Sequence, residues 1–266
     1  MRYELFSIGP ITIYGYGFMI ALGVLAALLT ASYRAKKAGL STDLIFNLTI
    51  LCVLGGFLGA KILYIITEWK SLMETKSLLD DLKNGFVVYG GIIAGILTAV
   101  IYCRHKKVSA LEYIDLAIPS VAIAQGLGRV GCFMSGCCYG RPTDAWYGVV
   151  FTDSPFAPLN VKLIPTQLFS SIGDLLIAAI LILAARKKPN KGVITSGYLL
   201  LYGVGRFLIE ILRNDPRGNV GALSTSQFIS IFMVAAGIVM MYLSCKGRFM
   251  SSKAEKEDEA KESEDK

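Results

Sequence analysis

Seven long apolar runs constrain the fold of this 266-residue chain more than any other feature. They cover residues 11–33, 45–67, 86–103, 116–127, 165–185, 193–212 and 226–245. A helix needs about 20 residues, at a rise of about 1.5 Å each, to cross the hydrocarbon core of a bilayer. Six of the runs approach or exceed that length. The fourth has twelve residues and contains Pro119, so it is short enough to be re-entrant. We count it as a span because the basic loops then all lie on the same side of the membrane.

The composition supports the same class of protein. Hydrophobic residues make up 54% of the chain and charged residues only 18%, whereas soluble domains carry about 25% charged residues. The first run is too long for the core of a signal peptide and is followed by no small-residue cleavage site, so we expect it to remain as a membrane helix. The sequence therefore predicts an all-α, polytopic membrane protein with seven transmembrane helices.

The basic residues of the short loops predict the orientation, because lysine and arginine accumulate in cytoplasmic loops. Basic clusters follow runs one, three, five and seven: Arg34, Lys36 and Lys37; Arg104, Lys106 and Lys107; Arg186, Lys187, Lys188 and Lys191; Lys246 and Arg248. This pattern places the N-terminus outside and the C-terminus in the cytoplasm. The net charge of +7 then reflects topology, and we expect no nucleic-acid partner.

Two parts of unequal size are expected. Residues 1–248 form one seven-helix integral membrane domain. Residues 249–266 are polar, mixed in charge and without an apolar face, which predicts a disordered cytoplasmic tail.

Two arginines lie where an arginine is costly. Arg129 follows the fourth run, and Arg206 lies inside the sixth, four residues before Glu210. A charge at the centre of a membrane helix costs about 2.5–3.5 kcal/mol on insertion scales. The planar guanidinium suits a phosphate or carboxylate and stays charged when buried. In the predicted topology both arginines belong to the outer half of the membrane, which favours one outward-facing polar cavity for an anionic head group.

Simpler interpretations of these polar residues remain open. Arg206 and Glu210 are spaced i, i+4 and could form a structural ion pair. Tyr16 and Tyr89 could belong to the interfacial aromatic belts of a membrane protein. Lys61 could be an interfacial anchor whose ammonium group reaches water.

Residues 126–140 combine five glycines with three cysteines, in the sequence GLGRVGCFMSGCCYG. The glycines predict irregular backbone near the membrane surface. For Cys132, Cys137 and Cys138 a disulfide, a metal site, close packing of small residues and a nucleophilic thiol are all open. A metal site would need further ligands, and the single histidine, His105, is expected on the cytoplasmic side. We therefore expect no metal and no cofactor, and the missing outer histidine excludes a Ser-His or Cys-His hydrolase.

Seven short motifs occur in order along residues 6–244: FSIGPITIYGYGFM, GGFLGAKILY, YGGIIAG, GLGRVGCF with CCYGRPT, PTQLF, GRFLIEILR and LSTSQFIS. In this order and spacing the chain resembles the phosphatidylglycerol–prolipoprotein diacylglyceryl transferases of bacterial plasma membranes. The resemblance implies a multi-pass enzyme that moves the diacylglyceryl group of phosphatidylglycerol onto the lipobox cysteine of a prolipoprotein. A thioether forms and glycerol phosphate leaves, so the implied partners are phosphatidylglycerol, lipobox peptides and membrane lipid.

The resemblance also implies roles for single residues. Arg206, Tyr89 and Glu210 correspond to catalytic positions. Arg129, Arg206, Tyr16 and Gly140 correspond to positions that bind phosphatidylglycerol.

Several positions depart from the pattern of this family. Tyr89 stands where histidine is common, Cys132 where asparagine is common and Cys137 where glutamate is common. A family acid is replaced by Ser170, and Asp174, one helical turn further on, is a candidate substitute; an active Asp174→Asn variant would reject that hypothesis. The alternative function is therefore a diverged paralogue that binds or transports an anionic lipid, or transfers its group to another acceptor.

Overall fold

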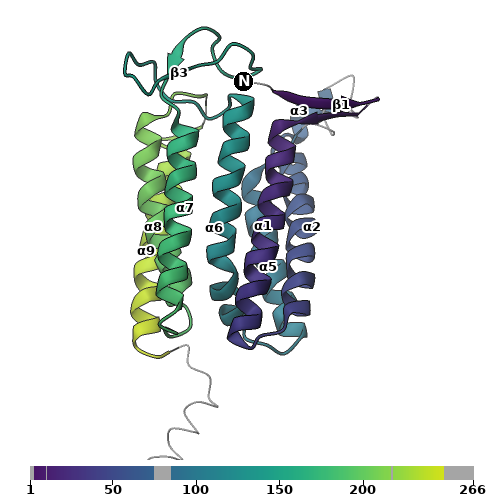
Figure 1. Ribbon diagram of the computed structural model, residues 1–266, viewed down its shortest axis with the longest axis vertical. Helices are drawn as coiled ribbons and strands as arrows, with labels where there is room; N and C mark the ends of the chain where they lie inside the picture. Colours follow the sequence, from purple (N-terminus) through teal and green to yellow (C-terminus); the bar gives the residue numbers. More distant parts are fainter. Residues whose placement is uncertain (1–2, 10, 75–84, 217, 249–266) are drawn as a thin grey trace, which may run out of the picture. The chain divides into compact units, whose positions relative to one another are not determined.

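The structure is a computed structural model that describes residues 3–9, 11–74, 85–216 and 218–248. Within these residues, seven helices are long and apolar enough to cross a membrane (Figure 1). They are α1 (Gly15–Ala38), α2 (Thr42–Thr67), α5 (Val88–His105), α6 (Ala110–Ser135), α7 (Thr166–Ala185), α8 (Val193–Leu212) and α9 (Thr225–Cys245). The predicted class, an all-α polytopic membrane protein, is confirmed. The predicted disordered tail at 249–266 lies outside the described residues.

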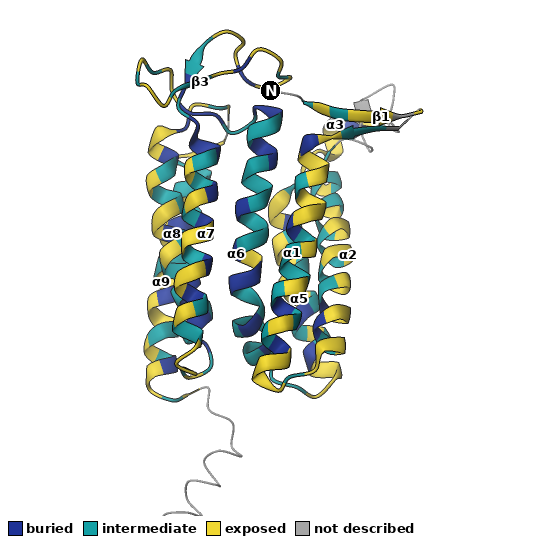
Figure 2. Ribbon diagram, in the orientation of Figure 1, coloured by how far each residue is buried: buried dark blue, intermediate teal, exposed yellow. Residues whose placement is uncertain are grey.

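Every membrane-spanning helix has exposed residues (Figure 2), and many of them are large and apolar. Leu25, Phe57, Leu176 and Phe232 are each at least half exposed. A soluble protein rarely exposes apolar surface on this scale. Hydrocarbon tails are as apolar as these side chains, so the exposed surface is explained if lipid covers it.

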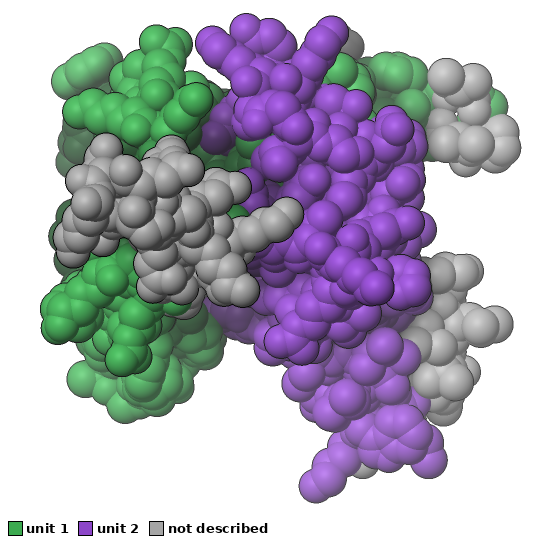
Figure 3. All heavy atoms as spheres, turned by 90° about the horizontal axis from the view of Figure 1, so that it is seen from below, with its two compact units in different colours: residues 1–30, 115–266 green, residues 31–114 purple. Residues whose placement is uncertain are grey.

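The chain divides into two compact units, residues 1–30 with 115–266, and residues 31–114 (Figure 3). In the second unit α2 packs closely on α5. A side chain at Gly90 would collide with the carbonyl of Gly59, and one at Gly59 with Ala94, so the glycines set the helix separation. Lys61 donates to the carbonyl of Gly85 at 2.9 Å. That ammonium is therefore engaged by protein near the end of α2.

In the first unit α8 packs between α7 and α9. Here again small residues allow the approach: a side chain at Gly203 would lie 2.8 Å from Val234, and one at Gly237 would lie 2.9 Å from Leu200. Tyr198 of α8 donates to Gln125 of α6 at 2.6 Å. This hydrogen bond satisfies the Tyr198 hydroxyl and the Gln125 side-chain carbonyl, which both lie within membrane helices.

The fourth span differs from its expected form. The apolar run at 116–127 suggested a short segment, but α6 has 26 residues with Pro119 inside it. The polar residues that interrupt the apolar pattern do not interrupt the helix, because Asp115 and Gln125 find partners on α8. Gly126, Gly128 and Gly131 are helical as well, so the prediction of irregular backbone was wrong for them.

Short strands accompany the helices. Strands β1 (Glu4–Ile8) and β2 (Ile11–Tyr14) form an antiparallel hairpin where the sequence suggested the start of a helix. Two further antiparallel pairs are β3 (Val149–Val150) with β4 (Lys162–Leu163), and β5 (Asn219–Val220) with β6 (Leu223–Ser224). A six-residue helix, α3 (Trp69–Glu74), follows α2. The β-branched residues of β2 stand at the start of the apolar run at 11–33, which also fits a helix.

Asp115 caps the N-terminus of α8. Its carboxylate accepts hydrogen bonds from the backbone N–H groups of Gly192 and Thr195 and from the Thr195 hydroxyl. These amides have no partner within the helix, and the negative charge faces the positive end of the helix dipole. The contact joins α6 to α8 across 77 residues of sequence.

Asp115→Ala is expected to lower the free energy of unfolding by roughly 1–2 kcal/mol, because a helix cap and its charge are lost. Denaturant unfolding of the detergent-solubilised protein would measure it. Asp43→Ala is the matched control, since Asp43 lies in the first turn of α2 but is exposed. Equal losses in both variants would contradict the assigned cap.

Candidate functional site

The C-terminal end of α6 is fixed by a tight backbone turn. Gly136 has a φ of 76°, its N–H donates to Phe133, and the N–H of Cys137 donates to Cys132. These two hydrogen bonds form a Schellman motif, which needs a residue in the left-handed conformation after the helix and favours glycine there. The turn directs the chain from the end of α6 into the segment 137–141.

That segment is fastened to the start of α7 and the end of α8. Thr166 donates to the carbonyl of Cys138 at 2.6 Å, and Gln167 donates to that of Cys137 at 2.7 Å. The Arg141 N–H donates to Leu212 at 2.9 Å. Because Thr166 and Gln167 are almost fully buried, these bonds lie in a water-poor setting and hold the ends of three helices together.

Gly140 lies at the closest approach in this junction. Its N–H donates to the Ile164 carbonyl at 3.0 Å. A side chain here would lie 2.7 Å from that same oxygen and 2.8 Å from Thr166. Gly140 also bridges to Arg213 through the backbone. The structure thus gives Gly140 a packing requirement at the site, independent of any contact with lipid.

A cavity of about 290 Å³ opens between α6, α7 and α8. Most of its lining is apolar, as suits an acyl or glyceryl group. The polar and charged side chains that line it are Arg129, Ser170, Asp174, Tyr202 and Arg206. The two arginines predicted to share one polar cavity are therefore brought together.

Arg206 belongs to an ion-pair network. Its Nη2 atom lies 3.0 Å from Glu210 Oε2 and donates to Ser226 Oγ at 2.8 Å. Glu210 Oε2 also lies 3.5 Å from Arg213 Nη1. The Glu210 side chain is only 1% exposed, so its charge holds both guanidinium groups in place.

Arg213 has a further partner of its own. It binds Asp215 through two hydrogen bonds of 2.9 and 2.6 Å. The hydrogen bonds and charge of Asp215, with the charges of Cys138 and Glu210, raise the pKa of Arg213 against the opposing effect of burial. Arg213 is thus a fixed cation beside the site.

Arg129 is placed differently from these two arginines. Within the described part of the chain it makes no hydrogen bond and no ion pair, although it is partly buried and lines the cavity. Its electrostatic neighbours include Tyr202 and Asp174. A guanidinium without a partner in a mostly apolar cavity is suited to receive an anionic ligand.

Asp174 is buried in the same cavity, and its Oδ2 atom has no hydrogen-bond partner among the described residues. Ser170, one turn earlier on α7, donates to the carbonyl of Thr166 at 2.7 Å. Asp174 is therefore the carboxylate that α7 presents to the arginines. Its role as a substitute for an acid at position 170 stays a prediction.

Tyr16 and Tyr89 lie in different units. Tyr16 packs against α6, with its Cδ2 atom 3.2 Å from where a side chain at Gly131 would begin. Tyr89 is the second residue of α5 and is partly exposed within the unit of residues 31–114. Tyr16 thus lies beside the helix that carries Arg129. Tyr89 belongs to the other unit, and its role at the site stays a prediction.

Sequence reasoning missed three residues of the site. Tyr202 lies one helical turn before Arg206, so its place in the cavity could have been inferred from helix geometry. Ser226 was visible as part of a recurring motif but had no assigned role. Asp215 lies beyond the end of α8 and pairs with Arg213, two residues earlier, so the spacing of these opposite charges was a local signal.

Known proteins resemble this chain over nearly its whole length. The family model described as prolipoprotein diacylglyceryl transferase matches residues 3–243. A phosphatidylglycerol–prolipoprotein diacylglyceryl transferase of Clostridium tetani is 52% identical over 90% of this chain and 96% of its own length. A protein of the same name, numbered 2, from Clostridium perfringens is 48% identical over 93% of this chain and 98% of its own.

A more distant relative with this name, from Finegoldia magna, is 34% identical over 88% of the chain and 92% of its own length. The identity therefore extends through the segments that carry the cavity and is not confined to one motif. The chain belongs to the prolipoprotein diacylglyceryl transferase family, and it is an enzyme of the transferase class.

Proposed function

We propose that this chain transfers the diacylglyceryl group of phosphatidylglycerol to the lipobox cysteine thiol of prolipoproteins. In this proposal it is a multi-pass protein of the bacterial plasma membrane, with the N-terminus outside and the C-terminus in the cytoplasm. Residues 1–248 carry the activity, and residues 249–266 form a cytoplasmic tail. The names of the bacterial relatives and the loop charges support the proposal.

The observation that carries the proposal is the cavity with two arginines from two helices. Arg206 is oriented by Glu210 and Ser226, while Arg129 has no described partner. Arg129 makes no hydrogen bond or ion pair with the described residues, so its guanidinium can bind the single negative charge of a phosphate diester. The apolar walls suit the glyceryl and acyl carbons next to that phosphate.

The reaction gains from cations in this position. The sulfur of the lipobox cysteine forms a bond to the glyceryl carbon that carries the phosphate. The C–O bond at that carbon breaks, its electron pair leaves with glycerol phosphate, and the thiol proton must be accepted by a base. Negative charge grows on the leaving phosphate, and preorganised guanidinium groups stabilise it in a water-poor site.

The proposed roles follow from this chemistry. Arg129 and Arg206 bind the phosphate, and Arg206 also stabilises the leaving group. Glu210 fixes Arg206. Tyr89 is proposed to take part in proton transfer, and Tyr16 and the backbone at Gly140 to bound the lipid head group.

The test uses purified protein in detergent with phosphatidylglycerol and a lipobox peptide containing one cysteine. Glycerol phosphate release and the mass of the peptide are followed together. Release matched by a diacylglyceryl mass gain on the peptide supports the proposal. Release with an unmodified peptide indicates another acceptor, and lipid binding without release indicates a binding or transport protein.

Tyr89→Phe is expected to lower kcat by roughly 10²-fold, the lower end of what a general acid or base contributes. The ring is retained, so packing at the start of α5 should not change. Tyr102→Phe, on the same helix, is the matched control and should keep full activity. Unchanged kinetics in Tyr89→Phe would show that the hydroxyl takes no part in the reaction, and Tyr89 would then be an interfacial aromatic residue.

A further inference from the structure

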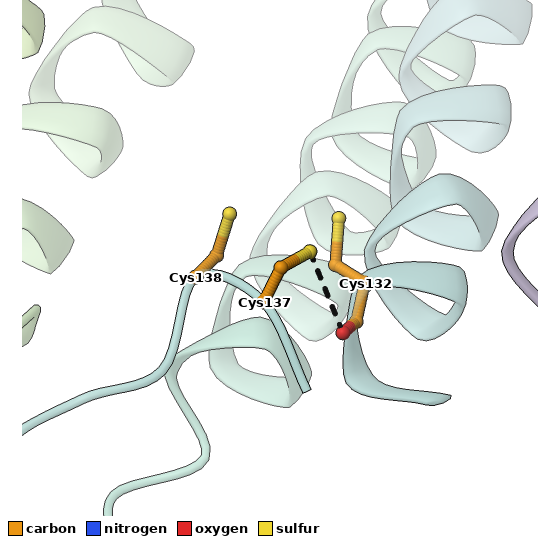
Figure 4. A group of neighbouring side chains, drawn as sticks. All are labelled: Cys132, Cys137 and Cys138. Atoms are coloured by element: carbon orange, nitrogen blue, oxygen red, sulfur yellow. Dashed lines mark hydrogen bonds between the residues drawn. The ribbon is translucent and has the colours of Figure 1, made fainter. Parts of the chain in front are cut away.

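Three cysteine side chains converge at the end of α6 (Figure 4). Cys132 lies in the last turn of the helix, and Cys137 and Cys138 follow the Schellman turn. Their sulfur atoms all lie within 4.8 Å of one another. All six cysteines of the chain are free thiols. The Cys137 thiol donates to the Cys132 carbonyl at 3.7 Å, the contact that the dashed line in Figure 4 marks.

The backbone holds the three residues rigidly. The Cys137 N–H donates to the Cys132 carbonyl at 3.2 Å. The carbonyls of Cys137 and Cys138 accept from Gln167 and Thr166 at the start of α7. Cys138 has a left-handed φ of 62°, an uncommon conformation for a residue with a side chain. The loop geometry that turns Cys138 toward the other thiols is therefore specified by contacts with α7.

A thiolate is the form of cysteine that binds metal ions. The cluster offers three such sulfur atoms in a preformed geometry.

We propose that Cys132, Cys137 and Cys138 bind one thiophilic metal ion, of the class represented by Zn²⁺, as three thiolate ligands. Zinc–sulfur bonds of about 2.3 Å in tetrahedral geometry place sulfur atoms about 3.8 Å apart. The observed separations need to contract by no more than about 1 Å to reach that value. The fourth position is filled by solvent, as at zinc sites with three protein ligands.

Three thiolates and a divalent cation carry a net charge of −1, and the thiol protons are released to solvent on binding. The sequence argued against a metal because the single histidine, His105, was expected on the cytoplasmic side. Three neighbouring sulfur atoms supply three ligands without a histidine.

The bound ion would link α6 to the loop that carries Gly140. Metal binding to a site present only in the folded chain stabilises that fold. The inference concerns a binding site that the transferase chemistry does not use, so it stands or falls independently of the proposed function.

The experiment uses full-length protein in detergent, reduced with a phosphine and freed of metal by dialysis. Cd²⁺ is titrated as the probe, and the ultraviolet thiolate-to-cadmium charge-transfer absorption is recorded. One Cd²⁺ per chain is expected, displaced by excess Zn²⁺. Cys137→Ser and Cys138→Ser should each weaken Cd²⁺ binding at least about 100-fold. Losing a residue that only hydrogen-bonds to a metal ligand costs up to about 100-fold, and losing a ligand itself should cost more. Cys52→Ser and Cys245→Ser are the matched controls and should bind as the unaltered protein does.

A second measurement needs no variant. The unaltered protein is alkylated with and without Zn²⁺, and the modified cysteines are located by mass spectrometry. Protection of Cys132, Cys137 and Cys138 by Zn²⁺, with no protection of Cys245, is the expected result. The site is rejected if the three thiols are alkylated equally with and without Zn²⁺, or if the charge-transfer absorption survives unchanged in Cys137→Ser and Cys138→Ser.

Discussion

Arg206→Ala is expected to lower kcat for diacylglyceryl transfer by about 10²–10³-fold or more, the effect of removing one preorganised donor at a developing negative charge. Arg206 lines the cavity, and its Nη2 atom is held by both Glu210 at 3.0 Å and Ser226 at 2.8 Å. It therefore needs little reorganisation when charge grows on the departing phosphate. Glycerol phosphate release by the purified variant measures the effect.

The fold should survive this change. Glu210 keeps an ion pair with Arg213 at 3.5 Å, so its buried charge is not left alone. Membrane insertion should not suffer, because α8 loses a charge that is costly in lipid. Expression level and thermal stability in detergent check both points.

Two matched variants separate catalysis from structure. Ser226→Ala removes the contact that ties Arg206 to α9 but keeps the cation, so it should retain most of the activity. Arg206→Lys keeps the charge but loses the planar fork, and an intermediate rate is expected. If Ser226→Ala were as inactive as Arg206→Ala, the arginine would serve mainly to join two helices.

The fold was predictable to the extent that lipid dictates it. Spanning segments must satisfy their backbone internally and present apolar side chains outward, and both requirements leave a long apolar run in the sequence. That signal located the seven helices. It gave too short a range for α6, because charged residues such as Asp115 and Arg129 lie inside this helix, and Asp115 is paired with α8. A run-length criterion cannot see a partner far away in sequence.

The two arginines of the site were predictable for a related reason. A cation inside an apolar run is costly, and its cost marks it as functional. The companion residues carry no such mark. Ser226 is an ordinary polar residue at the start of α9, and it joins the site through a contact with Arg206 that tertiary packing sets. Asp215 joins it through Arg213, two residues earlier in the sequence. The convergence of the three cysteines depends likewise on a backbone turn at Gly136 and on contacts with α7.

Arg129→Ala is expected to lower kcat/KM for phosphatidylglycerol by about 10²–10³-fold, with a clear loss of lipid binding, because the cavity loses the guanidinium that has no described protein partner. Its effect on stability should be the opposite of what a structural arginine would show. Removing a partly buried charge that forms no ion pair with described residues relieves a desolvation penalty, and this offsets the lost attraction to Asp174. The thermal midpoint of the variant in lipid-free detergent should therefore change little.

Glu210→Ala provides the contrasting case for that argument. It leaves Arg206 without its ion pair and removes a contact of Arg213, and breaking such a buried pair costs about 3–5 kcal/mol. Arg129→Ala should thus lose activity while keeping stability, whereas Glu210→Ala should lose both. Phosphatidylglycerol should raise the thermal midpoint of the unaltered protein but not that of Arg129→Ala, since only a bound ligand stabilises. A strongly destabilised Arg129→Ala, or one stabilised by phosphatidylglycerol as well as the unaltered protein is, would remove Arg129 from the head-group site.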